Sequence, residues 1–226
     1  MFVFDPLYVL VVMLPGMLIS GAASLAVRAA FNRYSQVAAR RGITGAQAAQ
    51  ILLQRAGIDD VTIVPTHGDL SDHYNPSNRQ LALSENVYNS SSVAAIGIAC
   101  HEAGHAIQHA ESYAFLGMRT ALVPLAGIGS SLGYLVMLVG LVMSMTPLLL
   151  VGAALFSLVL LFQVITLPVE FDASARAKHL VLEAGIVDPD EREGIDRVLN
   201  AAALTYVAAV ISSMLTLLYF FMRARE

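Results

Sequence analysis

Two histidines spaced four residues apart, His101 and His105, flank a glutamate and are the residues of this chain best suited to chemistry. On an α-helix, His105 lies about 40° and Glu102 about 100° round the axis from His101, so the three side chains share one sector. Two neutral imidazoles can hold a zinc ion, and the carboxylate can take a proton from a water on that ion. The spacing predicts a zinc site in which Glu102 is the catalytic base.

The residues before this motif favour a buried helix over about 92–110. Ser91 and Ser92 offer an N-cap, and an apolar run over 93–100 leads into the motif. Polar side chains on such a helix need partners, which a metal would supply. Cys100 directly precedes His101 but points about 100° away from it on a helix. We therefore expect Cys100 to be a small buried hydrophobic residue rather than a ligand.

A third ligand is required, because a catalytic zinc usually has three protein ligands and one open position. His109 continues the series, but three successive turns of a straight helix cannot easily close on one ion. His67 and His73 lie in an expected loop, where histidines are usually solvated. Glu170 follows a long uncharged stretch, where a carboxylate costs energy unless something neutralises it. We favour Glu170, although a place at a helix N-terminus would also explain its charge.

The composition indicates a membrane protein. The chain is 57% hydrophobic and 13% charged, with a mean hydropathy of +0.66, outside the usual soluble range. Residues 6–27, 120–169 and 198–222 carry no charge. A span needs about twenty apolar residues, so the outer stretches fit one crossing each and the middle one fits two, divided near Thr146 and Pro147. We expect four transmembrane helices rather than a large soluble helical core.

Basic residues predict the orientation by the positive-inside rule. The N-terminus would lie outside, and the segments before the second span and after the third would be cytoplasmic. The first stretch lacks the basic start of a cleavable signal peptide. Arg223 and Arg225 fall on the wrong side, and the net charge of −4 gives no indication of nucleic-acid binding. The residues that agree are Arg28, Arg33, Arg40, Arg41, Arg119, Arg176, Lys178, Arg192 and Arg197.

Local signals predict the elements outside the membrane. A helix is expected over 44–57, capped by Thr44. A strand over 61–64 should end at Pro65, and a second strand should cover 80–83 after a loop over 66–77.

Pro168 suits the first position of a helix that ends at Gly185, and Asp188 should start a helix that continues into the fourth span. The expected segments are 1–30 (first span), 31–119, 120–168 (second and third spans), 169–200 and 201–226 (fourth span and tail).

Four stretches resemble a known family: 101–109 (HEAGHAIQH), 72–76 (DHYNP), 83–88 (LSENVY) and 167–174 (LPVEFDAS). They are similar to the YugP-like bacterial membrane zinc peptidases, and the likeness covers nearly the whole chain. More distantly, the chain resembles membrane metallopeptidases of the HtpX and prenyl-protease type.

With this resemblance, the expected fold is a mainly α membrane protein with four transmembrane helices and a cytoplasmic, zincin-like α+β catalytic part, in the bacterial plasma membrane. One Zn²⁺ per chain would be held by His101, His105 and Glu170, with Glu102 as catalytic base.

The wider group of such enzymes commonly has an Asp four residues after the ligand Glu. Here that position is Ser174, and Asp172 lies only two residues on. Either Asp172 or Ser174 could therefore be the residue that hydrogen-bonds and orients a ligand histidine. The simpler role for Asp172 is a salt bridge with Arg176.

Substrate contacts are expected from a strand and from three donors. In zincins an edge strand pairs with extended substrate, which here would be Gln80, Leu81, Ala82 and Leu83. His109, His179 and Tyr206 are candidates, by residue type alone, for stabilising the transition state. The substrate would be a peptide or the flank of a membrane protein, with the lipid bilayer and other membrane proteins as partners.

Two alternatives stay open. The zinc could be structural, with His109 or His73 as a fourth ligand, in a non-catalytic membrane assembly module. The same residues could also hydrolyse a lipid or another amide.

Overall fold

The structure is a computed structural model that describes residues 5–225. Residues 1–4 of the predicted segment 1–30, and residue 226 of the segment 201–226, lie outside the described residues. The chain forms two compact units. The helical unit comprises the described residues of 1–24, 117–168 and 204–226, and the mixed unit comprises 25–116 and 169–203.

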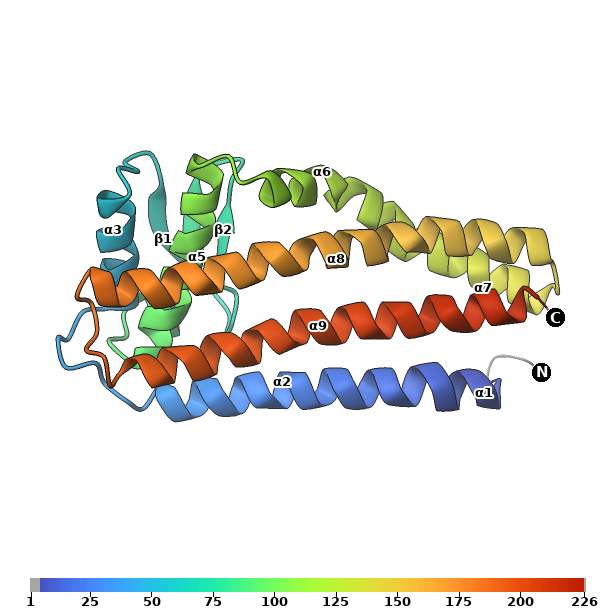
Figure 1. Ribbon diagram of the computed structural model, residues 1–226, viewed down its shortest axis with the longest axis horizontal. Helices are drawn as coiled ribbons and strands as arrows, with labels where there is room; N and C mark the ends of the chain where they lie inside the picture. The colour runs from blue at the N-terminus through green and yellow to red at the C-terminus, as the bar shows by residue number, and fades with distance from the viewer. Residues whose placement is uncertain (1–4, 226) are drawn as a thin grey trace. The chain divides into compact units, whose positions relative to one another are not determined.

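Four helices in the described residues are long and apolar enough to cross a membrane, as predicted. Figure 1 labels their α-helical parts α1, α2, α6, α7, α8 and α9. The first, Pro6–Tyr34, consists of α1 (Pro6–Tyr8), the π-helical η1 (Val9–Met13) and α2 (Leu14–Tyr34). The second, Ala114–Val142, consists of α6 (Ala114–Ile128), the π-helical η2 (Gly129–Gly133) and α7 (Tyr134–Val142). The third and fourth are α8 (Thr146–Glu183) and α9 (Arg192–Arg223).

The predicted division of the middle stretch is confirmed. Helix α7 ends at Val142, and α8 begins at Thr146 with Pro147 in its first turn. Proline is favoured there because the first N–H groups of a helix have no partner within it. Ser144 adopts a positive φ of 54° in the turn between the two helices.

The prediction that a helix begins at Pro168 is wrong. Pro168 lies inside α8, which continues without interruption to Glu183. A proline removes only one hydrogen bond from a helix, and long apolar helices tolerate that loss when the neighbouring backbone adjusts. Glu170 is therefore an interior residue of α8, and a helix N-terminus cannot account for its charge.

An acidic residue lies beside one of the arginines that oppose the positive-inside rule. In the helical unit, the Asp5 carboxylate accepts a hydrogen bond from the Tyr219 hydroxyl and lies 3.6 Å from Nε of Arg223. The charge of Arg223 thus has a counter-ion within its own unit.

The mixed unit begins with the predicted helix after Thr44. Helix α3 (Gly45–Arg55) opens with a capping box, in which Thr44 Oγ1 accepts from the Gln47 N–H and Gln47 Oε1 accepts from the Thr44 N–H. Gly57 follows its end with a φ of 68°. The predicted helix over 44–57 is confirmed.

Three strands form one small sheet in the order β1-β3-β2. Strand β1 (Thr62–Thr66) runs parallel to β3 (Gln80–Ser84), and β2 (His73–Asn75) runs antiparallel to it. The prediction that β1 ends before Pro65 is wrong, because an edge strand tolerates a residue without an N–H. The expected loop over 66–77 also contains β2, which the local sequence did not indicate.

Strand β3 is the central strand, so the prediction that 80–83 forms a sheet edge is wrong. Hydrogen-bonded neighbours occupy both of its sides. Residues 81–84 are all buried, whereas the sequence indicated a half-buried strand. The prediction of a half-buried strand failed because Ala82 is buried together with Leu81 and Leu83. The strand edges of this sheet belong to β1 and β2.

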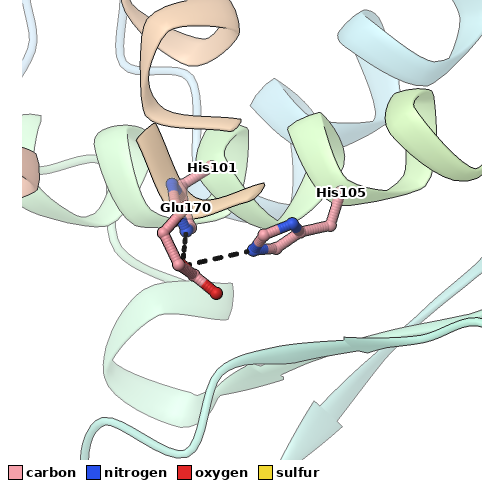
Figure 2. Close-up of side chains that lie close together, drawn as sticks. All are labelled: His101, His105 and Glu170. Carbon is pink, nitrogen blue, oxygen red and sulfur yellow. Dashed lines mark hydrogen bonds and ion pairs between the residues drawn. The ribbon is translucent and has the colours of Figure 1, made fainter. Parts of the chain in front are cut away.

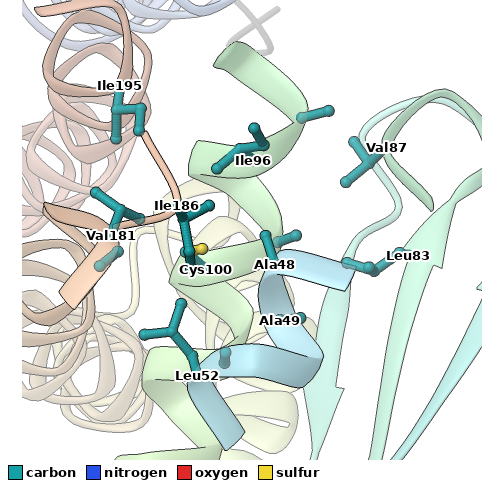
Figure 3. Packing of buried hydrophobic residues seen from close by; sticks show 14 of the residues in the cluster. Ala48, Ala49, Leu52, Leu83, Val87, Ile96, Cys100, Val181, Ile186 and Ile195 are labelled. Carbon is teal, nitrogen blue, oxygen red and sulfur yellow. The ribbon is translucent and has the colours of Figure 1, made fainter. Parts of the chain in front are cut away.

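Helix α5 (Val93–Ala110) is the centre of the core of the mixed unit. Figure 3 shows its residues Ile96 and Cys100 among side chains from α3 and from the later segments of the unit, such as Leu52 and Val181. Cys100 is fully buried, as predicted. The short helix α4 (Glu85–Tyr88) connects β3 to α5. Apolar contacts on several sides therefore fix the helix that carries the two histidines.

The segment between α8 and α9 follows its predicted pattern in part. Helix α8 ends at Glu183, and Gly185 has a φ of 63°. The Asp188 N–H donates to the Glu191 carboxylate, and the Glu191 N–H donates to the Asp188 carbonyl. These two bonds form a turn, so α9 begins at Arg192 rather than at Asp188. The expected continuation of this helix into the fourth span is confirmed.

Candidate metal centre

Helix α5 brings the two histidines of the motif together. Ser92 caps the helix, because its hydroxyl accepts a hydrogen bond from the Ala95 N–H. The imidazole rings of His101 and His105 lie one turn apart, with their centroids 4.8 Å from each other. Almost every residue between Val93 and Gln108 is buried. The two rings are thus polar groups in an apolar setting.

Glu170 of α8 completes a group of three. Its Oε2 lies 3.2 Å from Nε2 of His101 and 3.6 Å from Nε2 of His105. Figure 2 shows the carboxylate pointing at both rings. Only 2% of Glu170 and 7% of His105 is exposed. A buried carboxylate costs free energy unless it is paired, and two imidazole nitrogens meet it here.

The three side chains fit a zinc ion. A tetrahedral zinc with bonds of about 2.0–2.1 Å to N and O places its ligand atoms roughly 3.3 Å apart. The ligand atoms of His101, His105 and Glu170 all lie within 4.8 Å of one another. Among residues 5–225, the group includes no fourth histidine, cysteine or carboxylate. Three protein ligands and an open position are the donor set of a catalytic zinc site.

Gly104 lets α8 approach the histidines. A Cβ at this position would lie 2.9 Å from the carbonyl oxygen of Ala173 and 3.3 Å from its Cα. These are backbone atoms, which cannot turn aside as a flexible side chain does. The glycine between the two histidines therefore permits the helix contact that brings Glu170 to them.

Ser174 is the partner of the first histidine. Its hydroxyl lies 3.1 Å from Nδ1 of His101, and the side chain is buried. A hydroxyl can accept from the Nδ1–H of His101, which leaves Nε2 free for a metal. Asp172, the other candidate, points elsewhere and receives a bond from Nε of Arg176 at 2.6 Å.

Gln108 contacts the second histidine and was missed in the sequence. Its Oε1 lies 3.0 Å from Nδ1 of His105, and its Nε2 donates to Asp172 and to the Val169 carbonyl. Asp172 thus reaches His105, a candidate ligand, through one intermediate side chain, besides its bond to Arg176. The available signal was a glutamine one turn after His105 on a helix with few other polar groups.

Glu102 is buried near a second carboxylate, that of Asp72. Only 9% of Glu102 is exposed. Asp72 accepts hydrogen bonds from the N–H and the hydroxyl of Ser84. Burial raises the pKa of Asp72, the bonds from Ser84 oppose this rise, and the charge of Glu102 adds to it. Asp72 stands in the predicted loop and was also missed as a neighbour of the site.

Charges around His105 favour its protonated form when no cation is bound. Burial acts to lower the pKa of His105, but hydrogen bonding to Glu170 and the charge of Glu102 outweigh it, so the pKa is raised. A proton and a metal ion compete for Nε2, because a ligand imidazole must be neutral. Metal binding at this site should therefore weaken as pH falls.

The three residues proposed to contact substrate lie in different surroundings. His109 Nδ1 is 2.8 Å from the hydroxyl of Tyr74 in the edge strand β2. His179 is exposed and 3.3 Å from Glu183, about 13 Å along α8 from Glu170. Tyr206 belongs to the helical unit, and its role stays a prediction.

The alternative ligands His67 and His73 have partners of their own. His67 is almost fully exposed and lies 3.0 Å from Glu85. His73 Nδ1 lies 2.8 Å from the carbonyl of Ser71.

Comparison with known proteins gives the class. Residues 9–225 match the sequence profile of a family described as "Putative neutral zinc metallopeptidase". The chain belongs to this family. A relative from Bacillus subtilis (strain 168), named "Putative membrane protease YugP", is 44% identical over 200 residues, which cover 88% of this chain and 89% of the relative. No solved structure matches the chain.

Proposed function

We propose that this protein is a membrane-anchored, zinc-dependent endopeptidase that cleaves peptide bonds at the cytoplasmic surface of the plasma membrane. One observation carries the proposal: the buried carboxylate of Glu170 lies 3.2 Å and 3.6 Å from the Nε2 atoms of His101 and His105. Glu102, the residue after the first histidine, supplies a carboxylate beside them. Family membership supports the same reaction class.

Each residue of the site has its own role in the proposed reaction. When bound, zinc acts as a Lewis acid and lowers the pKa of a coordinated water to about 7. His101, His105 and Glu170 would hold one ion per chain. Glu102 accepts a proton from the attacking water and then passes it to the leaving amine. Ser174 orients His101. The small sheet beside the motif helix supports a zincin-like α+β catalytic part.

An edge strand near the site would bind extended substrate by main-chain hydrogen bonds. Strand β2 is the better candidate, because β3 is enclosed and Tyr74 of β2 reaches His109 on the motif helix. His109 is then a donor candidate for the transition state. A cytoplasmic flank of a membrane protein would suit a site close to the bilayer.

The orientation follows from the arginines. The segments 31–119 and 169–200 are separated by two spans, and residues from both contribute to the mixed unit, which supports their lying on the same membrane side. Arg28, Arg33, Arg40 and Arg41 make that side the cytoplasm by the positive-inside rule. The N-terminus is then outside.

Cysteine labelling tests this orientation. Cys100 is buried, so an introduced cysteine reports without background. A membrane-impermeant maleimide on intact cells should label Met145→Cys, between α7 and α8, and spare Gln54→Cys in α3. The opposite pattern would contradict a cytoplasmic site.

Zinc content and cleavage test the activity. Detergent-purified protein should contain one zinc per chain and cleave an unstructured protein such as casein. Glu102→Gln should retain zinc and lose roughly 10²- to 10⁴-fold in rate, because the proton acceptor is gone. Glu193→Gln is the control, since Glu193 is exposed and 3.5 Å from Arg197.

Three other results would each count against a part of the proposal. Equal activity of Glu102→Gln and wild type would remove Glu102 from the chemistry. Tightly held zinc without cleavage of any peptide would favour a structural metal in a membrane assembly module. Cleavage of a lipid or another amide instead of peptides would favour a different zinc hydrolase.

A further inference from the structure

Gln108 is a fully buried polar side chain next to a candidate metal ligand. It lies one turn after His105 on α5, and none of its surface is exposed. A buried amide without partners would be costly, and all of its polar atoms have partners here. One of these partners is His105 on its own helix, and the other two, Val169 and Asp172, belong to α8.

The partners on α8 determine which way the amide points. Gln108 Nε2 lies 2.8 Å from the carbonyl oxygen of Val169 and 2.8 Å from Oδ2 of Asp172. Both oxygens can only accept, so the NH₂ group must face them and Oε1 must face the imidazole. Turning the amide over would place Oε1 against two acceptors.

The orientation of the amide then determines the proton on the imidazole. Oε1 of Gln108 lies 3.0 Å from Nδ1 of His105 and can only accept. Nδ1 must therefore carry the hydrogen. In a neutral imidazole this leaves the lone pair on Nε2, the atom that faces Glu170 at 3.6 Å.

Asp172 is itself held in place. Nε of Arg176 donates to its Oδ2 at 2.6 Å, and Nη1 of Arg176 donates to Oε2 of Glu111 at 2.7 Å. The carboxylate that orients the amide is therefore fixed by a guanidinium with a second anchor on the chain. The series Glu111, Arg176, Asp172 and Gln108 ends at His105.

We propose that Gln108 is a positioning residue that keeps His105 in the Nδ1–H tautomer and so presents Nε2 to the metal, with Asp172 holding the amide in orientation. The inference deepens the proposed function, because it assigns a role at the same site. Losing such a partner of a ligand histidine typically costs about 10- to 100-fold in metal affinity.

The test compares two variants that act on different histidines. Gln108→Met removes the acceptor beside His105, and Ser174→Ala removes the hydroxyl beside His101. The full-length protein, ¹⁵N-labelled at histidine and loaded with zinc, is examined by NMR for imidazole Nδ1–H protons protected from exchange. Zinc dissociation constants come from competition with a chelator.

The wild type should have protected Nδ1–H protons at both histidines. Gln108→Met should lose the His105 signal alone and bind zinc about 10- to 100-fold more weakly. Ser174→Ala should lose the His101 signal alone. A protected His105 signal in Gln108→Met, unchanged zinc affinity, or loss of both signals in each variant would overturn the proposal.

The His101 signal guards against a folding defect in the methionine variant, because it persists only if the metal centre is assembled. Loss of the His101 signal together with the His105 signal would assign Gln108 to packing only. Neither the NMR signals nor the zinc dissociation constants depend on cleavage. A protein that shows this NMR pattern but cleaves no peptide would refute the peptidase alone. A protein that cleaves peptides but lacks this NMR pattern would refute the role of Gln108 alone.

Discussion

Replacing Gly104 by alanine tests whether the close contact between α5 and α8 assembles the metal centre. The added Cβ would lie 2.9 Å from the Ala173 carbonyl oxygen, about 0.5 Å short of the 3.4 Å at which ordinary contact begins. Because the obstacle is backbone, α8 must move as a unit. Glu170 is on the same helix, three residues before Ala173, and must move with it.

Two opposing effects act on stability. Overpacking typically costs about 1–3 kcal/mol, whereas alanine favours a helix over glycine by about 1 kcal/mol. The free energy of unfolding should therefore fall by only about 0–2 kcal/mol. Metal binding responds more strongly, because ligand distances tolerate about 0.2 Å. We expect the zinc dissociation constant to rise at least about 10-fold, as for other disturbances close to ligands.

The assay is chelator competition on the detergent-purified protein, with thermal unfolding of the metal-free form measured beside it. Gly117→Ala is the matched control, since a Cβ there meets nothing within 4 Å. It should bind zinc as the wild type does. If Gly104→Ala also bound zinc with unchanged affinity, the position of Glu170 would not depend on this contact and the reasoning would fail.

Glu170→Gln should lower zinc affinity at least about 100-fold, because a neutral amide is a poor zinc ligand; stoichiometric zinc after dialysis would contradict this role. The pKa of Asp72 is higher in the folded state than in the unfolded chain, where it is near 3.8. The folded state therefore keeps the Asp72 proton to higher pH. The stability that comes from this protonated carboxyl group is lost as pH rises through the folded pKa. Asp72→Asn should accordingly gain stability relative to the wild type above that pH in denaturant titrations; an identical pH profile would argue against a buried charge. Thr44→Ala should cost about 0.5–2 kcal/mol in the same titration by removing the capping box, and a cost near zero would mean that the cap is not used in solution.

Local patterns were sufficient for much of this protein. The four spans follow from uncharged runs, whose length alone decides whether a helix can cross a bilayer. Helix α5 and the common face of His101 and His105 follow from a cap and a four-residue spacing. Such features depend on residues within a turn or two of each other, so they are present in the sequence itself.

Errors occurred where neighbours distant in the chain decide the outcome. Pro168 resembles a helix start, but the flanking sequence is helical on both sides, and α8 continues through it. Strand β3 resembles a half-buried strand, but pairing with both β1 and β2 makes it central. The short strand β2 forms because it pairs with β3, and a segment of three residues is too short for its own sequence pattern to predict a strand.

At the candidate metal centre, the sequence by itself determined the two histidines, the glutamate between them and their common helix face, because helix geometry relates residues one turn apart. Only the tertiary structure decided that Glu170 reaches them from α8, that Gly104 permits that approach, and that Gln108 and Ser174 hold the imidazoles. These contacts join residues more than sixty positions apart or depend on which face of α5 meets α8. Helix packing, rather than any local preference, sets them.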